Sequence, residues 1–179
     1  KLIYSGSSTK IALYEAEDTH SPYSWSKKKN TEHLQLYAKW FGLDYAITYF
    51  YNVYGEGEIN TGKYSTVVAK FLESYKSKSD HIMVVEPGTQ KRYFTHINDV
   101  VSALVLVGES GRGDGYGIGS DEPYTILELA EMIGLPIKMS PKRRGNRMDA
   151  ELVIEKTKAL GWQCKNNLEN YITEMKKSF

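Results

Sequence analysis

Residues 45–53 have the sequence YAITYFYNV, which is mostly apolar and aromatic. A strand with one face in water alternates apolar and polar residues, whereas this run suits a strand that is covered on both faces. Strands of that kind occur in parallel sheets with helices on both sides. The run therefore predicts a strand inside an α/β fold.

Two shorter segments predict further parallel strands. Leu2-Ile3-Tyr4 is apolar and runs directly into a polar loop, and Tyr116-Gly117-Ile118 lies within a glycine-rich region. We predict a parallel sheet from residues 2–5, 45–53 and 116–118. The glycines around the last of these strands indicate crowding of the backbone.

Helical spacing of apolar residues predicts the elements that surround this sheet. The longest helix covers residues 23–41 and ends before Gly42, a residue type that commonly follows a helix. Its predicted inward line is Tyr23, Lys27, Asn30, Leu34, Ala38 and Phe41. Further helices are predicted at 65–75, at 98–107 with Asn98 or Asp99 as the cap, at 125–133 with a capping box of Thr125 and Glu128, at 149–160 and at 168–175. Short strands are predicted at 82–85 and 93–97.

Composition excludes several classes of protein. The chain has 179 residues, 41% hydrophobic and 25% charged, with a net charge of +1, which is typical of a globular domain and not of a disordered or nucleic-acid-coating chain. It holds no apolar run near the roughly 18 residues of a membrane span. Cys164 is the single cysteine, so no internal disulfide is expected and a cytoplasmic location is the default. Without a Cys/His cluster, no metal site is expected.

Tyr23 and Lys27 form the pair with the clearest chemical potential. Pro22 favours a helix start, and residues four apart lie on one face of a helix. An ammonium beside a phenol stabilises the phenolate, which can move a proton to or from a sugar hydroxyl. The alternative is an ordinary exposed pair of helix residues.

The sequence contains no recognisable turn for cradling phosphates. Gly113, Gly115, Gly117 and Gly119 are each separated by one residue, and no helical pattern follows at the offset that a dinucleotide fingerprint requires. A P-loop motif is also absent from the sequence. These glycines are better explained as a loop and a crowded strand.

Several motifs together resemble the extended short-chain dehydrogenase/reductase family, whose best-known members are NAD-dependent nucleotide-sugar epimerases and dehydratases. They occur in the family's order along nearly the whole chain: Leu2–Ser8, Pro22–Lys27, Phe50–Gly55, Lys91–Val100, Gly117–Ser120, Pro141–Asn146 and Lys156–Trp162. Family members carry about a hundred residues before the strand that matches Leu2–Tyr4, including the glycine fingerprint. The resemblance therefore implies the C-terminal portion of a Rossmann-like parallel sheet with a small mixed α/β substrate-binding lobe.

The resemblance also implies roles for individual residues. Ser7 would be the catalytic hydroxyl that holds the substrate, Tyr23 the acid/base, and Lys27 the residue that tunes it and bonds the nicotinamide ribose, with Ser5 also at the cofactor. Asn52 would contact the nucleotide sugar. Arg92 and Arg143 would grip its diphosphate, with Arg144 as an alternative to Arg143, because a guanidinium binds phosphate in a bidentate manner.

The function implied is the catalytic and substrate-binding part of a NAD-dependent nucleotide-sugar epimerase, with NAD or NADP as cofactor and a nucleotide-diphosphate sugar as substrate. Ser8-Thr9 stands where 4,6-dehydratases carry Asp-Glu, which favours an epimerase. Tyr49, Tyr93 and Ile11-Ala12 depart from the family pattern of Arg, Asp and Tyr-Gly. The alternatives are a non-catalytic sugar-nucleotide-binding or interaction module, or a nucleotide-sugar dehydratase or reductase.

The resemblance also suggests how the chain is organised. Residues 1–55 would form the end of the Rossmann domain with the catalytic helix, and 56–179 mainly the substrate lobe, with 93–119 returning to the sheet. A homodimer is expected through the helix that carries Tyr23, with Leu36, Tyr37 and Trp40 as candidate contacts. Neither nucleic acid nor a membrane is expected as a partner.

Overall fold

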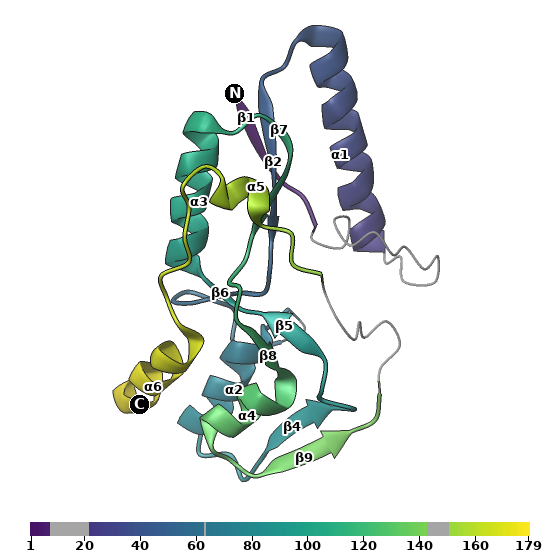
Figure 1. Cartoon of the computed structure of the whole chain (residues 1–179). Coiled ribbons are helices and arrows are strands. Elements are labelled where there is room, and N and C mark those ends of the chain that lie inside the picture. The colour runs from purple at the N-terminus through teal and green to yellow at the C-terminus, as the bar shows by residue number, and fades with distance from the viewer. Residues whose placement is uncertain (8–21, 63, 143–150) are drawn as a thin grey trace.

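The computed structural model describes residues 1–7, 22–62, 64–142 and 151–179. The elements of the first half of the chain are β1 (Leu2–Ser5), α1 (Pro22–Phe41), β2 (Tyr45–Phe50), β3 (Val53–Tyr54), α2 (Val67–Lys76), β4 (Ile82–Val85), β5 (Lys91–Tyr93) and β6 (Thr95–His96). Those of the second half are α3 (Ile97–Ser110), β7 (Gly113–Ile118), β8 (Pro123–Thr125), α4 (Ile126–Ile133), β9 (Ile137–Ser140), α5 (Glu155–Lys158) and α6 (Leu168–Ser178). In Figure 1 the upper part of the molecule is a sheet with helices beside it, and the lower part is a smaller lobe.

The sheet confirms the three predicted parallel strands, but with different bounds: β2 ends at Phe50, Val53 belongs to β3 in another sheet, and β7 begins at Gly113. Its order is β1-β2-β7, and both pairings are parallel. In Figure 1, α3 lies on one side of these strands and α1 on the other. Side chains of β2 alternate between the two helices: Ile47 and Tyr49 pack with Leu34 of α1, whereas Ala46 packs with Val107 of α3. This two-sided burial explains the mostly apolar character of β2.

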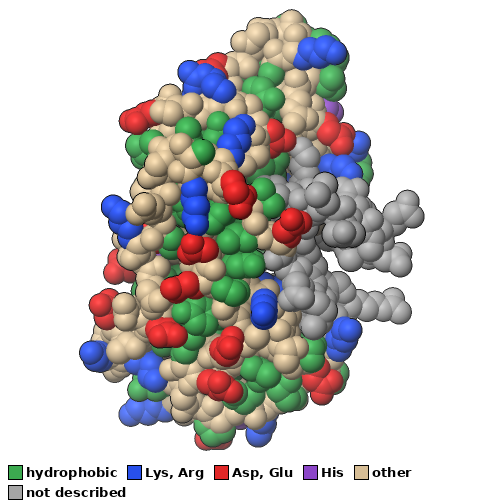
Figure 2. All heavy atoms as spheres, viewed as in Figure 1, with side chains coloured by type: hydrophobic (Ala, Val, Ile, Leu, Met, Phe, Trp, Pro, Cys, Tyr) green, Lys and Arg blue, Asp and Glu red, His purple; other side chains and the backbone are tan. Residues whose placement is uncertain are grey.

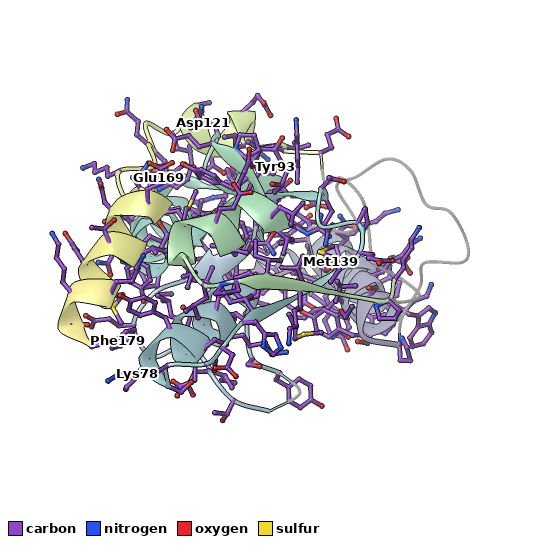
Figure 3. The ribbon with its side chains drawn as sticks, turned by 90° about the horizontal axis from the view of Figure 1, so that it is seen from below. Lys78, Tyr93, Asp121, Met139, Glu169 and Phe179 are labelled. Atoms are coloured by element: carbon purple, nitrogen blue, oxygen red, sulfur yellow. The ribbon has the colours of Figure 1, made fainter. Side chains whose placement is uncertain are left out.

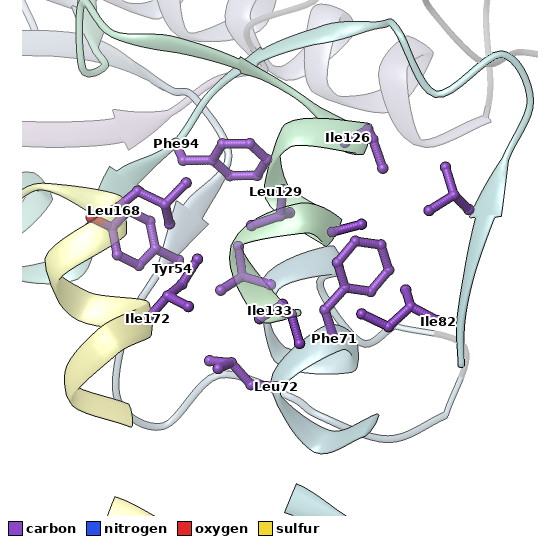
Figure 4. Close-up of a cluster of buried hydrophobic side chains, with 13 residues drawn as sticks. Tyr54, Phe71, Leu72, Ile82, Phe94, Ile126, Leu129, Ile133, Leu168 and Ile172 are labelled. Carbon is purple, nitrogen blue, oxygen red and sulfur yellow. The ribbon is translucent and has the colours of Figure 1, made fainter. Parts of the chain in front are cut away.

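The lower lobe has its own hydrophobic core, which is drawn in Figure 4. Phe71 and Leu72 of α2, Leu129 and Ile133 of α4, and Ile172 of α6 form its centre. The lobe is edged by two small sheets, the parallel pair β4-β9 and the antiparallel pair β5-β8. Strands β8 and β9 were not expected from the sequence, because three or four residues at the edge of a sheet carry too little periodicity to identify.

The C-terminal segment returns from the lobe to the sheet. The Thr157 hydroxyl of α5 donates to the Gly117 carbonyl of β7 over 2.6 Å. A Cβ atom at Gly117 would lie 1.8 Å from the carbonyl oxygen of Val153, so only glycine permits this close approach. The expected crowding of the backbone is therefore confirmed.

Some helix predictions were right and others were wrong. The capping box of Thr125 and Glu128 at the start of α4 is confirmed. The cap of α3 is instead His96, whose side chain accepts from the Asn98 amide, so neither Asn98 nor Asp99 caps this helix. The predicted helix over 149–160 is also wrong: within the described residues it is reduced to the single turn of α5, and 151–154 are not helical. The packing of these residues against β7 overrides their helical propensity.

Helix α1 ends at Phe41 as predicted, and Gly42 adopts a φ of +68°. The predicted inward line was partly wrong, because Asn30 is exposed and Phe41 is 71% exposed. The buried residues of the helix are Thr31 and Leu34. The buried face of α1 therefore differs from the predicted one. Polar contacts of the helix, described below, orient it together with its apolar packing.

The surface mixes charges of both signs. Figure 2 shows acidic and basic side chains interspersed over one face, with hydrophobic side chains exposed between them. Seen from below in Figure 3, Phe179 at the end of α6 lies beside the end of α2, and the Lys76 ammonium is 5.3 Å from the centre of its ring. Among the described helices, none has the length and apolarity to cross a bilayer.

Candidate active site at the carboxyl end of β1

Lys27 ties α1 to the last residue of β1. Its Nζ donates a hydrogen bond of 2.9 Å to the carbonyl oxygen of Ser5. The same ammonium lies 5.2 Å from the centre of the Tyr4 ring, a distance at which a cation and an aromatic face attract each other. The ammonium is therefore fixed at the carboxyl end of a parallel strand, where ligands bind in open α/β sheets.

Tyr23 stands one turn before Lys27, at the start of α1. The Lys27 Nζ is 6.0 Å from the centre of the Tyr23 ring, and the tyrosine is 63% exposed. The predicted pair is thus together on one face of the helix, and its phenol is open to a ligand. An exposed phenol beside a fixed ammonium can exchange a proton with a bound hydroxyl.

Ser7 follows β1 in a segment that is held tightly against β2. The Gly6 amide donates to the Thr48 carbonyl over 2.8 Å, and a Cβ at Gly6 would lie 2.6 Å from the ring of Tyr49. Glycine at this position lets the chain pass against the tyrosine, so that half-buried Ser7 emerges just beyond the end of the strand.

A polar network that was not anticipated from the sequence fixes the other end of α1. Asp114 of β7 accepts hydrogen bonds from the Tyr49 hydroxyl, at 2.6 Å, and from the Gln35 amide of α1, at 2.9 Å. Burial, followed by the bond to Asp114, raises the pKa of Tyr49 far above its usual value. Gln35 lies eight residues after Lys27, which is two turns along the same face, and this spacing was the available signal.

Asn52 and Arg92 lie where the sheet meets the lobe. Asn52 follows β2 with a φ of +31°, and its carbonyl accepts from the Thr95 amide over 3.2 Å. Arg92 is a half-buried residue of β5. Their chain neighbours Tyr51 and Tyr93 have ring centres 6.1 Å apart, so the two segments run close together.

The structure therefore brings Ser5, Tyr23 and Lys27 together. Ser7 lies two residues beyond Ser5 in the chain, and Asn52 follows the strand next to β1. Arg143, and its alternative Arg144, lie outside the described residues. Within the described ranges, no group of three His, Cys, Asp or Glu is arranged to hold a metal ion.

Asp99 anchors the C-terminal segment to the start of α3 instead of capping that helix. Its buried carboxylate accepts from the backbone amides of Lys165, at 3.1 Å, and Asn166, at 3.0 Å. The Cys164 thiol donates to the same carboxylate over 3.2 Å. Burial, and next the bond to Asp99, raise the pKa of Cys164 to about 11. The thiol is thus held as a donor.

Comparison with known proteins shows the family of this chain. The family model described as "NAD dependent epimerase/dehydratase family" matches residues 3–119. A putative UDP-glucose 4-epimerase from Methanocaldococcus jannaschii is 30% identical over 159 residues, which are 85% of this chain and 51% of that protein. A GDP-mannose 3,5-epimerase from Arabidopsis thaliana is 29% identical over 167 residues, or 86% of this chain and 44% of the relative.

Solved structures share the fold. The UDP-glucose 4-epimerase of Thermotoga maritima, solved with UDP-glucose, superposes with a TM-score of 0.86 at 24% identity, over 99% of this chain and 62% of that one. The UDP-glucose 4-epimerase of Thermus thermophilus, in complex with NAD, gives a TM-score of 0.84 at 23% identity, over 98% and 62% of the two chains. The predicted α/β class with a Rossmann-like parallel sheet is confirmed. The chain spans about half the length of the relatives it matches.

The contact between Cys164 and Asp99 predicts a pH dependence of stability. A thiol whose pKa is raised in the folded state contributes stability that is present below the unfolded pKa and lost as pH rises through the folded value. The unfolding free energy should therefore fall more steeply between pH 9 and 11 in the unaltered chain than in Cys164→Ala. Urea unfolding across this range measures the difference, because background titrations of lysine and tyrosine affect both proteins. Parallel curves would contradict it.

Proposed function

This chain belongs to the NAD dependent epimerase/dehydratase family, and from that premise we propose that it is the catalytic and substrate-binding part of a nucleotide-sugar epimerase. The single observation that carries the proposal is the bond from the Lys27 ammonium to the Ser5 carbonyl. This bond holds the ammonium at the carboxyl end of a parallel strand, one helical turn from the exposed Tyr23 phenol. If Lys27 were only an exposed helix residue, its ammonium would not need to contact the Ser5 carbonyl.

In the proposed reaction, Tyr23 takes the proton of a sugar hydroxyl and later returns it. Lys27 stabilises the phenolate electrostatically and bonds the ribose of the cofactor, while Ser7 holds the reacting hydroxyl. NAD or NADP, when bound, supplies the hydride acceptor, and the protein supplies position and proton transfer. Ser5 contributes to the cofactor side because its carbonyl orients the lysine.

For the substrate, we assign Asn52 to the nucleotide sugar and Arg92 and Arg143 to its diphosphate. The close approach of the segments carrying Asn52 and Arg92 supports a joint role. In the corresponding division of the chain, residues 1–55 belong to the cofactor domain and 56–179 mainly to the substrate lobe, with 93–119 returning to the sheet. The parallel pairing of β7 with β2 supports this division.

A second candidate is a module that binds a sugar nucleotide without redox chemistry. It is favoured by the lack of a glycine-rich phosphate turn within residues 1–179. The two functions make different predictions for NAD.

Binding is tested by titrating the chain with UDP-glucose, GDP-mannose and NAD while following Tm. A ligand of the native state raises stability by RT ln(1 + [L]/Kd), which is about 2.7 kcal/mol at a hundredfold excess over Kd. We expect a sugar nucleotide to raise Tm, and Arg92→Gln to weaken its binding by roughly tenfold or more, since hydrogen bonds to charged groups contribute about 1.5–3 kcal/mol.

Arg112→Gln is the matched control, because this exposed arginine pairs with Asp44 at 3.3 Å and belongs to the surface near β7. Equal losses in the two variants would point to non-specific attraction of the phosphates. Stabilisation by a sugar nucleotide without any by NAD would select the second candidate.

Catalysis is tested by supplying NAD and UDP-glucose to the chain, alone and mixed with the N-terminal half of the Methanocaldococcus jannaschii relative, and following formation of the 4-epimer. Tyr23→Phe should lower kcat by about 10² to 10⁴, the usual contribution of a positioned acid/base, without weakening UDP-glucose binding. Tyr64→Phe makes the same change at another exposed tyrosine and should be silent. Unchanged turnover in Tyr23→Phe would refute the assigned role.

We also propose that α1 pairs with a second copy of the chain. Leu36, Tyr37 and Trp40 are 41%, 56% and 61% exposed, which leaves a large apolar surface for association. Light scattering should give a dimer mass at high concentration and a monomer mass for Trp40→Glu. A monomer at every concentration of the unaltered chain would contradict the proposal.

A further inference from the structure

A cavity lies away from Tyr23 and Lys27. It has a volume of about 450 Å³ and sits between the start of α3, the segment after β3 and helix α6. Helix α3 covers the face of the sheet opposite to α1, as Figure 1 shows, so this cavity and the candidate active site lie on different sides of the molecule. Its volume is within the range of small-molecule sites, roughly 300–1,000 Å³.

His96 is a buried polar wall of this cavity, with 8% exposure. Its Nδ1 accepts the Asn98 amide hydrogen over 3.2 Å, so in the neutral ring the proton is on Nε2, which becomes a donor. No hydrogen bond from this Nε2 to another described residue is formed. The imidazole thus offers a donor to a ligand in the cavity.

Two tyrosines pack against this imidazole. The ring centres of Tyr54 and Tyr171 are 5.2 Å and 5.5 Å from that of His96. The Tyr54 hydroxyl is buried without a hydrogen-bond partner among the described residues. Burial, and then the nearby carboxylates of Glu58 and Glu56, raise the pKa of Tyr171 to about 12, so its hydroxyl stays protonated at neutral pH.

The rim of the cavity combines donors and acceptors. Glu56 and Glu174 present carboxylates, Asn98 and Asn170 present amides, and Lys165 presents an ammonium, all on exposed residues. Tyr171 and Met175 add apolar surface from α6. A ligand that pairs with all of these polar groups must both donate and accept hydrogen bonds, and it must also present an apolar face.

We propose that the cavity between α3 and α6 binds a neutral saccharide. Hydroxyl groups both donate and accept, which matches the amides, the carboxylates and the unused imidazole donor. The CH face of a sugar ring can pack on Tyr171 and Met175. Two carboxylates against one ammonium repel phosphate, so this site discriminates against the nucleotide that we assign to the other side of the sheet.

The test is a titration of the ¹⁵N-labelled full chain with D-glucose, D-galactose and N-acetyl-D-glucosamine, followed by NMR. We expect saturable shifts of the Asn98 and Asn170 side-chain amides and of the His96 ring. Asn170→Leu should weaken binding by roughly tenfold through the lost hydrogen bonds. Asn30→Leu replaces an exposed amide on α1 and should leave the affinity unchanged.

Other outcomes overturn the proposal. Absence of saturable shifts with all three sugars would do so, as would equal affinity in Asn170→Leu and the unaltered chain. A response to putrescine or inorganic phosphate alone would identify a charge-selective cavity instead. Sugar-induced shifts confined to the Tyr23 and Asn52 region would assign the binding to the proposed substrate site, and leave this cavity without a ligand.

Discussion

The hydrogen bond from Lys27 to the Ser5 carbonyl sets the position of α1 on the sheet. This helix has twenty residues but buries only Thr31 and Leu34, so apolar packing alone would hold it loosely. A charge-assisted bond to a backbone oxygen at one end and the Gln35 bond to Asp114 near the other fix its rotation. The face that carries Tyr23 is consequently directed toward the end of β1.

A second constraint joins the sheet to the lobe. Asp99 is a buried carboxylate at the start of α3, and it holds the segment 164–166 from which α6 departs into the lobe core. Trp162 reinforces this junction, because its indole donates to the Asp99 carbonyl over 3.1 Å. The same junction forms one wall of the α3–α6 cavity, so the contacts that connect the two parts of the molecule also shape a site between them.

Much of the fold could be predicted because its signals are local. The continuous apolar run at 45–53, the capping box at Thr125 and the glycine after α1 each depend on neighbours in sequence. The failures have one physical origin. His96 caps α3 although His is an uncommon cap. Residues 151–154 are not helical, because this segment packs against Gly117. Strands β8 and β9 exist through pairing with distant partners, which a single short segment cannot reveal.

For the candidate site, the order of residues alone showed which groups are available and that Tyr23 and Lys27 share a helix face, because helical periodicity places residues four apart on the same face. The order of motifs also gave the family. Three features required the folded coordinates: the lysine reaches the Ser5 carbonyl, Asp114 links β7 to both Tyr49 and Gln35, and His96 and Tyr171 meet at the α3–α6 cavity. These contacts join residues tens of positions apart, and their geometry follows from how strands and helices pack, which no local pattern encodes.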